Sequence, residues 1–287
     1  GRGAAGHMLG AVRAAAASLL GSAGDAPECE AELSTASHVW CLLLLDGRVL
    51  VGCADGTIRV WPLDAHAAAG NSFRAHEGTV YSLAACTEPE LTVFSGGADS
   101  TLRCWKPRDD THGALHPDRV LASAPPGTRP VLALAAQPGA LFSADAEGRI
   151  QRWEPADDAW RATTTAECGV RVYALVLVRA PRGGPAEGTA APTDHNNSLA
   201  ARDLIASAGC EGSVCLWRCA DLSPIAHLGA HAAPAHTLYA LAACDGGNDA
   251  PLLLAAGAGD CHVRIFTCDA AGGDSALVGI LEPGGAV

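Results

Sequence analysis

The sequence predicts an all-β fold, a β-propeller of four-stranded antiparallel blades with about five blades present. Three observations predict it. A turn acid is followed three residues later by an aliphatic residue and after three more by an aromatic one, and this pattern recurs at intervals of 44, 48, 64 and 49 residues. That spacing is close to the period of roughly 40–45 residues with four strands per unit that is typical of propeller blades. Short apolar runs separated by turn residues indicate strands rather than helices. The turn acids are Asp55, Asp99, Glu147, Glu211 and Asp260.

Each unit contains the same segments in the same order. A first apolar run, such as VYSLAAC at 80–86, precedes a second, such as LTVFSGG at 91–97, and a turn leads into a third that ends at the aromatic residue. Gly56, Gly148 and Gly212 follow turn acids, which predicts tight two-residue turns in which glycine supplies a positive φ. The aromatic residues are predicted to lie in the blade core, because burial of one ring removes a large apolar area from water.

The repeats resemble the WD-repeat (tryptophan-aspartate) β-propeller family from about residue 30 to residue 287. In that family a hydrogen-bonded set of His, Ser or Thr, Asp and Trp holds each blade together. The second repeat matches all four positions, the third and fourth repeats keep Ser143 and Ser207, and the first and fifth have Val51 and Ala256 instead of serine. The resemblance therefore implies a structural network in the five blades, comprising Asp55, Trp61, His76, Ser95, Asp99, Trp105, Glu147, Trp153, Glu211, Trp217 and Asp260.

The domain organisation predicted from composition is a leader followed by one repeat domain. Residues 1–30 are an Ala-rich leader or linker, and the propeller occupies residues 31–287. Residues 179–203 interrupt the fourth repeat and are rich in Pro, Gly and polar residues, which predicts a disordered surface loop; a partner-binding motif is the alternative. The segment from about residue 282 resembles the start of a further blade. Because the family most often has seven blades, the sequence predicts an incomplete seven-bladed ring.

Composition disfavours several function classes. The formal net charge is −12 and the pI about 5.3, whereas phosphate binding needs a basic stripe, so a nucleic-acid partner is not expected. No uninterrupted apolar stretch reaches the length of a membrane span. The sequence lacks a nucleophile elbow, a phosphate loop and a zinc-protease motif, so we expect no catalytic residues, no cofactor and no enzyme activity in this chain.

Cysteine and histidine residues do not predict a metal site. The twelve cysteines include no C-x-x-C pair, and within strands a cysteine behaves as a small hydrophobic residue. Reduced thiols favour a cytoplasmic location, with the nucleus as the alternative. His227, His231 and His236 lie close together in sequence, and the simpler interpretation is that one of them caps the fifth blade as His76 does the second.

One aligned position stands out as a candidate binding position. In the resembling family the second residue of the first strand, together with the residue before the turn acid, faces the narrow end of the ring, where partner peptides commonly dock. Here the residues before the turn acids are small, and neither position carries Arg or Lys in any repeat, which disfavours a phosphopeptide reader. Packing between adjacent blades is the alternative role. The first-strand residues at this position are Trp40, Tyr81, Leu132, Tyr173 and Tyr239.

The sequence thus predicts a non-catalytic protein-interaction scaffold that binds a protein or peptide on this face, since Tyr and Trp are enriched at interface hot spots. The alternative is a substrate-receptor or regulatory domain of a larger enzyme assembly, such as a ubiquitin ligase.

Overall fold

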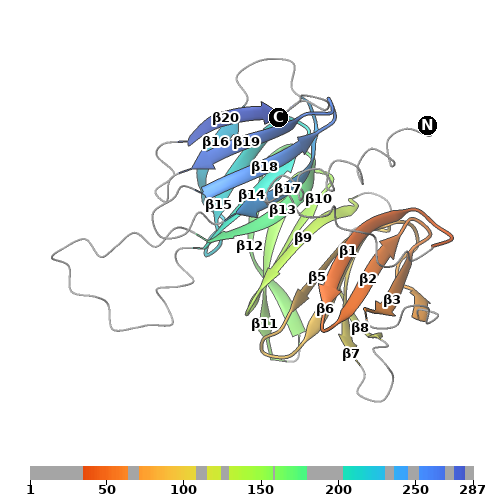
Figure 1. Cartoon of the computed structure of the whole chain (residues 1–287). Coiled ribbons are helices and arrows are strands. Elements are labelled where there is room, and N and C mark those ends of the chain that lie inside the picture. Colours follow the sequence, from red (N-terminus) through yellow and green to blue (C-terminus); the bar gives the residue numbers. More distant parts are fainter. Residues whose placement is uncertain are drawn as a thin grey trace. The chain divides into compact units, whose positions relative to one another are not determined.

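The computed structural model describes residues 35–63, 71–107, 115–123, 129–157, 159–179, 203–229, 236–244, 252–268 and 275–281. The predicted leader, the predicted loop between 179 and 203 and the predicted further blade lie outside these ranges. All twenty regular elements of the described residues are β-strands, and they form five four-stranded antiparallel sheets, which we call blades and number in chain order (Figure 1). The prediction of an all-β propeller with five blades is confirmed. No helix among the described residues is long and apolar enough to cross a membrane.

The strands of the first three blades are β1 (Val39–Leu45), β2 (Arg48–Cys53), β3 (Thr57–Pro62) and β4 (Asn71–Arg74); β5 (Val80–Cys86), β6 (Thr92–Gly97), β7 (Thr101–Pro107) and β8 (Leu115–Ser123); and β9 (Val131–Gln137), β10 (Ala140–Asp145), β11 (Arg149–Ala156) and β12 (Ala159–Glu167). The strands of the last two blades are β13 (Val172–Arg179), β14 (Asp203–Gly209), β15 (Ser213–Arg218) and β16 (Pro224–Gly229); and β17 (Leu238–Cys244), β18 (Leu252–Ala258), β19 (Val263–Cys268) and β20 (Ser275–Leu281).

Strand order within every blade follows the chain, and the first strands of consecutive blades contact one another, from β1 through β5, β9 and β13 to β17. The register between the second and third strands is the same in all five blades. In each, the aromatic residue pairs with the residue two positions before the serine position: Val49 with Trp61, Val93 with Trp105, Leu141 with Trp153, Ile205 with Trp217, and Leu254 with Phe266.

The turns between the second and third strands differ from the predicted two-residue turns. In the first four blades three residues connect these strands, and the residue after the turn acid closes the loop by donating its N–H to the carbonyl three residues earlier. That residue has a positive φ in all five blades, as expected where a turn is followed by a left-handed residue that matches the strand twist. The residues and angles are Gly56 (83°), Ser100 (66°), Gly148 (86°), Gly212 (68°) and Cys261 (68°).

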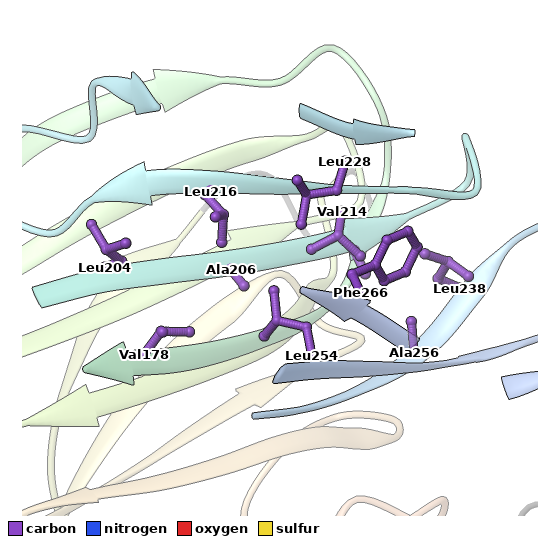
Figure 2. Close-up of a cluster of buried hydrophobic side chains, with 11 residues drawn as sticks. Val178, Leu204, Ala206, Val214, Leu216, Leu228, Leu238, Leu254, Ala256 and Phe266 are labelled. Carbon is purple, nitrogen blue, oxygen red and sulfur yellow. The ribbon is translucent and has the colours of Figure 1, made fainter. Parts of the chain in front are cut away.

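Four of the five buried hydrophobic clusters lie between consecutive blades, and the fifth lies within the first blade. Figure 2 shows the cluster between the fourth and fifth blades, where Val214 and Leu216 of β15 lie near Leu254 of β18 and Phe266 of β19. Similar clusters join the first blade to the second, the second to the third and the third to the fourth. Because neighbouring blades cover both faces of a sheet, second strands such as β6 are buried along their whole length, and such strands carry continuous apolar runs.

The first blade exposes side chains that its neighbours bury. Leu83 and Ala85 of β5 pack against the first blade. The equivalent residues of β1 are Leu42 and Leu44, whose exposed fractions are 64% and 69%. This outer side of β1 therefore presents an apolar strip to solvent.

Candidate functional site

The second blade contains a buried chain of hydrogen bonds among the four residues that sequence analysis selected. The indole N–H of Trp105 donates to Ser95 Oγ at 2.8 Å, and Ser95 Oγ lies 2.6 Å from His76 Nε2. His76 Nδ1 lies 2.9 Å from Asp99 Oδ1. One neutral tautomer of His76 satisfies both of these contacts, because Nδ1–H then donates to the Asp99 carboxylate and Nε2 accepts the Ser95 hydroxyl proton. Burial lowers the pKa of His76, and the neighbouring Asp99 offsets only part of that effect.

Asp99 is the acceptor that organises this hairpin. Its Oδ1 accepts the backbone N–H of Thr101 at 3.1 Å and the Thr101 hydroxyl at 2.7 Å, while Oδ2 accepts the N–H of Glu77 at 3.0 Å. Burial alone would raise the pKa of Asp99, but the bonds from Thr101, Glu77 and His76 outweigh it and hold the pKa at about 2. Asp99 is therefore a charged structural acceptor at neutral pH.

The tryptophan–serine bond recurs in two further blades. Trp153 donates to Ser143 at 2.9 Å and Trp217 donates to Ser207 at 2.8 Å. The fifth blade replaces both partners at once, with Phe266 and Ala256 at the equivalent positions, so neither polar group is present. All three blades that keep the serine therefore use it to satisfy a buried indole N–H.

Three of the turn acids form the same two interactions within their hairpins. Each of them accepts the backbone N–H of the residue two positions after it and forms an ion pair with the arginine four positions after it. The pairs are Asp55 with Arg59, Asp99 with Arg103, and Asp260 with Arg264. Hydrogen bonding to Arg264 is the main reason that the pKa of Asp260 lies well below its usual range. These carboxylates are engaged within their own blades.

The third blade differs from the sequence interpretation, which placed Glu147 in the network. The turn N–H groups of Glu147 and Arg149 donate instead to Asp145 Oδ1, at 2.9 and 3.0 Å. An aspartate side chain is short enough to accept from the backbone two residues on, whereas the longer side chain of Glu147 reaches Arg129 at 2.8 Å. Glu211, the turn acid of the fourth blade, is exposed.

The five candidate binding residues share a backbone feature that the sequence did not indicate. Each lies at the start of a first strand, at the position where the pairing register with the second strand shifts by one residue. Such β-bulges re-aim a side chain away from the regular alternation of the strand. We call these residues the aromatic surface: Trp40, Tyr81, Leu132, Tyr173 and Tyr239.

Side chains of the aromatic surface contact one another across blades and remain accessible. The rings of Trp40 and Tyr81 are 5.3 Å apart at 84°, and those of Tyr173 and Tyr239 are 5.1 Å apart at 52°. Trp40 is 55% exposed and Tyr239 45%, while the other three are half-buried. The four aromatic residues therefore do contact neighbouring blades, as the alternative role requires, yet none of the five residues belongs to the buried clusters.

Backbone hydrogen bonds hold the small residues before the turn acids beside this surface. In each blade the N–H of that residue donates to the carbonyl that precedes the first strand. The five bonds are Ala54 to His38 (2.9 Å), Ala98 to Thr79 (2.9 Å), Ala146 to Pro130 (3.0 Å), Cys210 to Arg171 (3.1 Å) and Gly259 to Thr237 (2.8 Å).

Arg171 was not predicted from the sequence, because only the second residue of each first strand and the residue before each turn acid were compared. Arg171 immediately precedes β13 and is exposed. Its Nη1 donates to the Tyr173 hydroxyl at 3.4 Å, and its Nε donates to the carbonyl of Ala146 in the third blade at 3.4 Å. The aromatic surface therefore includes one guanidinium at its edge.

The described residues hold no group of three His, Cys, Asp or Glu side chains arranged to bind a metal ion. Of the three clustered histidines, His227 lies on β16, His231 lies outside the described residues, and His236 Nε2 lies 3.8 Å from Asp260 Oδ2. Burial raises the pKa of the Cys41 thiol to about 12 and that of Cys215 to about 11, so both are protonated at neutral pH.

Comparison with known proteins supports the fold. The family model "WD domain, G-beta repeat" matches residues 27–62 and 69–106. A chain in the crystal structure of the mitotic checkpoint complex is similar in structure, with a TM-score of 0.61 and 14% identity, over 88% of this chain and 67% of that one. The WD40 β-propeller domain of Doa1 is similar with a TM-score of 0.57 and 16% identity, over 88% of this chain and 71% of that domain. A search of curated proteins finds no match.

Proposed function

Since this chain is a WD-repeat β-propeller, we propose that it is a non-catalytic scaffold that binds a protein or peptide partner on the aromatic surface. Members of the WD-repeat family, whose model matches part of this chain, generally bind proteins and are generally non-catalytic. One structural neighbour is a chain of a multi-protein complex, which agrees with a role in assembly. The same surface would serve if the chain were the substrate-receptor part of a larger enzyme assembly.

The observation that carries the proposal is the repeated bulge. In all five blades the first strand departs from regular pairing at the second residue, which is Trp, Tyr or Leu, and Trp40 and Tyr239 are about half exposed. A residue needed only for packing could alternate regularly into the core, as Leu83 and Ala85 do on β5. Aromatic side chains that are half exposed and held on a rigid backbone are suited to interface hot spots.

The turn acids support a binding role rather than catalysis. The carboxylates of Asp55, Asp99 and Asp260 are committed to backbone N–H groups and arginines of their own blades, so they are poorly suited to general acid or base chemistry, which requires a group that exchanges its proton with substrate.

The test compares peptide binding by the full chain and by a Tyr81→Ala, Tyr173→Ala variant. Peptides are first selected from a random displayed library on the unmodified chain, and their affinities are then measured by titration. We expect the double variant to lose binding by about tenfold or more, with little change in the thermal midpoint. Leu63→Ala is the control, because Leu63 is also exposed but follows β3 outside the surface. Equal affinity for the double variant and the control would contradict the proposal.

A further inference from the structure

Most arginines near the hairpins are already neutralised by a carboxylate. Arg59, Arg103 and Arg264 pair with the turn acid of their own blade, and Arg129 pairs with Glu147. Arg171 differs from all four. Within the described residues no carboxylate lies at ion-pair distance from it, and its contacts are with a phenol hydroxyl and a backbone carbonyl, which are both neutral.

The backbone of Arg171 is held rigidly. Its carbonyl accepts the N–H of Cys210 at 3.1 Å. A Cβ atom placed on Gly209 would lie 1.9 Å from the same carbonyl oxygen, so only glycine allows this approach between the hairpin and the start of β13. The position of Arg171 is thus set by the turn of its own blade.

The side chain of Arg171 extends across to the neighbouring blade. It bonds to Tyr173 of the fourth blade and to Ala146 of the third. Hydrogen bonding to Tyr173 is the main reason that the pKa of Arg171 lies above its ordinary value. A guanidinium carries five donors, and these two bonds use two of them, which leaves donors for a further acceptor.

We propose that Arg171 is the anion-binding residue of the aromatic surface and that the partner presents a carboxylate to it, flanked by apolar residues that pack on Tyr81 and Tyr173. A planar guanidinium binds a carboxylate through two parallel hydrogen bonds. A single arginine suits a carboxylate better than a phosphate, because phosphopeptide readers use arginine clusters. This inference rests on the proposed function and specifies the chemistry of its partner.

The experiment uses the peptides selected on the unmodified full chain. We expect Asp or Glu to be enriched at one peptide position with apolar neighbours. Replacing that residue by its amide, or replacing Arg171 by Gln, should each weaken binding by about tenfold or more, and the two changes together should cost little more than either alone. Arg161→Gln is the matched control, because Arg161 is exposed on β12 and pairs with Asp157. Peptides with a free and an amidated C-terminus distinguish a terminal from a side-chain carboxylate.

The outcomes separate this inference from the proposed function. Loss of binding in the Tyr81→Ala, Tyr173→Ala variant but full affinity in Arg171→Gln would contradict the proposed carboxylate contact and would still support the aromatic surface as the binding site. Selected peptides without acidic enrichment, or tighter binding when the acidic residue is replaced by phosphoserine, would also overturn it. Failure to select any peptide, or full affinity in both variants, would contradict both proposals.

Discussion

The indole N–H of Trp153 donates to the hydroxyl of Ser143 at 2.9 Å inside the third blade. In the fifth blade, Phe266 and Ala256 occupy the two equivalent positions. A donor and its acceptor have thus been lost together, and the register between the strands is unchanged. This pairwise replacement shows how a blade keeps its packing without the bond.

Ser143→Ala should lower the free energy of unfolding by about 1–3 kcal/mol, because it leaves a buried indole N–H without an acceptor. Adding Trp153→Phe should recover part of that loss, as in the fifth blade. Urea denaturation of the two single variants and the double variant measures the coupling. Strictly additive losses would contradict this role for the bond.

Acidification should destabilise the second blade through His76. Burial keeps the folded-state pKa of His76 below its ordinary value of about 6.5. The unfolded chain therefore binds this proton more readily, so the stabilisation is complete above pH about 6.5 and is lost as the pH falls below it. Asp99, with a pKa of about 2, adds a further loss between pH about 4 and about 2. His76→Gln should flatten the fall in thermal midpoint between pH 7 and 5, whereas His227→Gln, on an exposed residue of β16, should leave the slope as it is.

Cys261→Gly should raise the free energy of unfolding by about 1 kcal/mol, because Cys261 holds a φ of 68° that a non-glycine side chain adopts only with strain. Ser100→Gly is the comparison. Ser100 also has a positive φ, but its hydroxyl oxygen accepts the N–H of Arg129 at 2.9 Å, so its replacement should give a smaller gain or a loss. Chemical denaturation of both variants tests the difference, and equal effects would argue against it.

Two equivalent leucines should respond differently to truncation. Leu83→Ala on β5 removes a buried side chain between two blades and should cost about 2–4 kcal/mol. Leu42→Ala on β1, at the matching position, should change stability by no more than about 0.5 kcal/mol, because Leu42 is largely exposed. A large loss for Leu42→Ala would show that its side chain is covered in solution.

The sequence was sufficient to predict the blade repeat because each blade buries two central strands and one aromatic residue, which leave apolar runs at a fixed spacing. Fourth strands were harder to recognise. β4 and β12 are mostly exposed and carry polar segments such as NSFR and AWRATTTAE, so they lack a hydrophobic signal. The hairpins were predicted one residue too short, since the loop also includes the residue before the acid, such as Ala54 or Ala98, whose N–H donates to the carbonyl before the first strand.

The candidate site was only partly readable from sequence. Aligning the repeats identified Tyr81 and Tyr173, but the bulges depend on strand pairing, and Arg171 joins the surface only because its side chain crosses to the carbonyl of Ala146. In the third blade Asp145 accepts the turn N–H groups in place of the predicted Glu147, because the shorter side chain reaches the backbone of the turn. Such contacts are set by three-dimensional geometry, which periodicity does not encode.

Hydrogen–deuterium exchange of the full chain, with and without a selected peptide, tests the central claim most directly. The account predicts slower exchange at the starts of the first strands, around Tyr81 and Tyr173, and at the hairpins beside them, where Ala98 and Cys210 donate to the strand starts. Protection confined to the outer strands, or to the exposed side of β1 around Leu42 and Leu44, would contradict it.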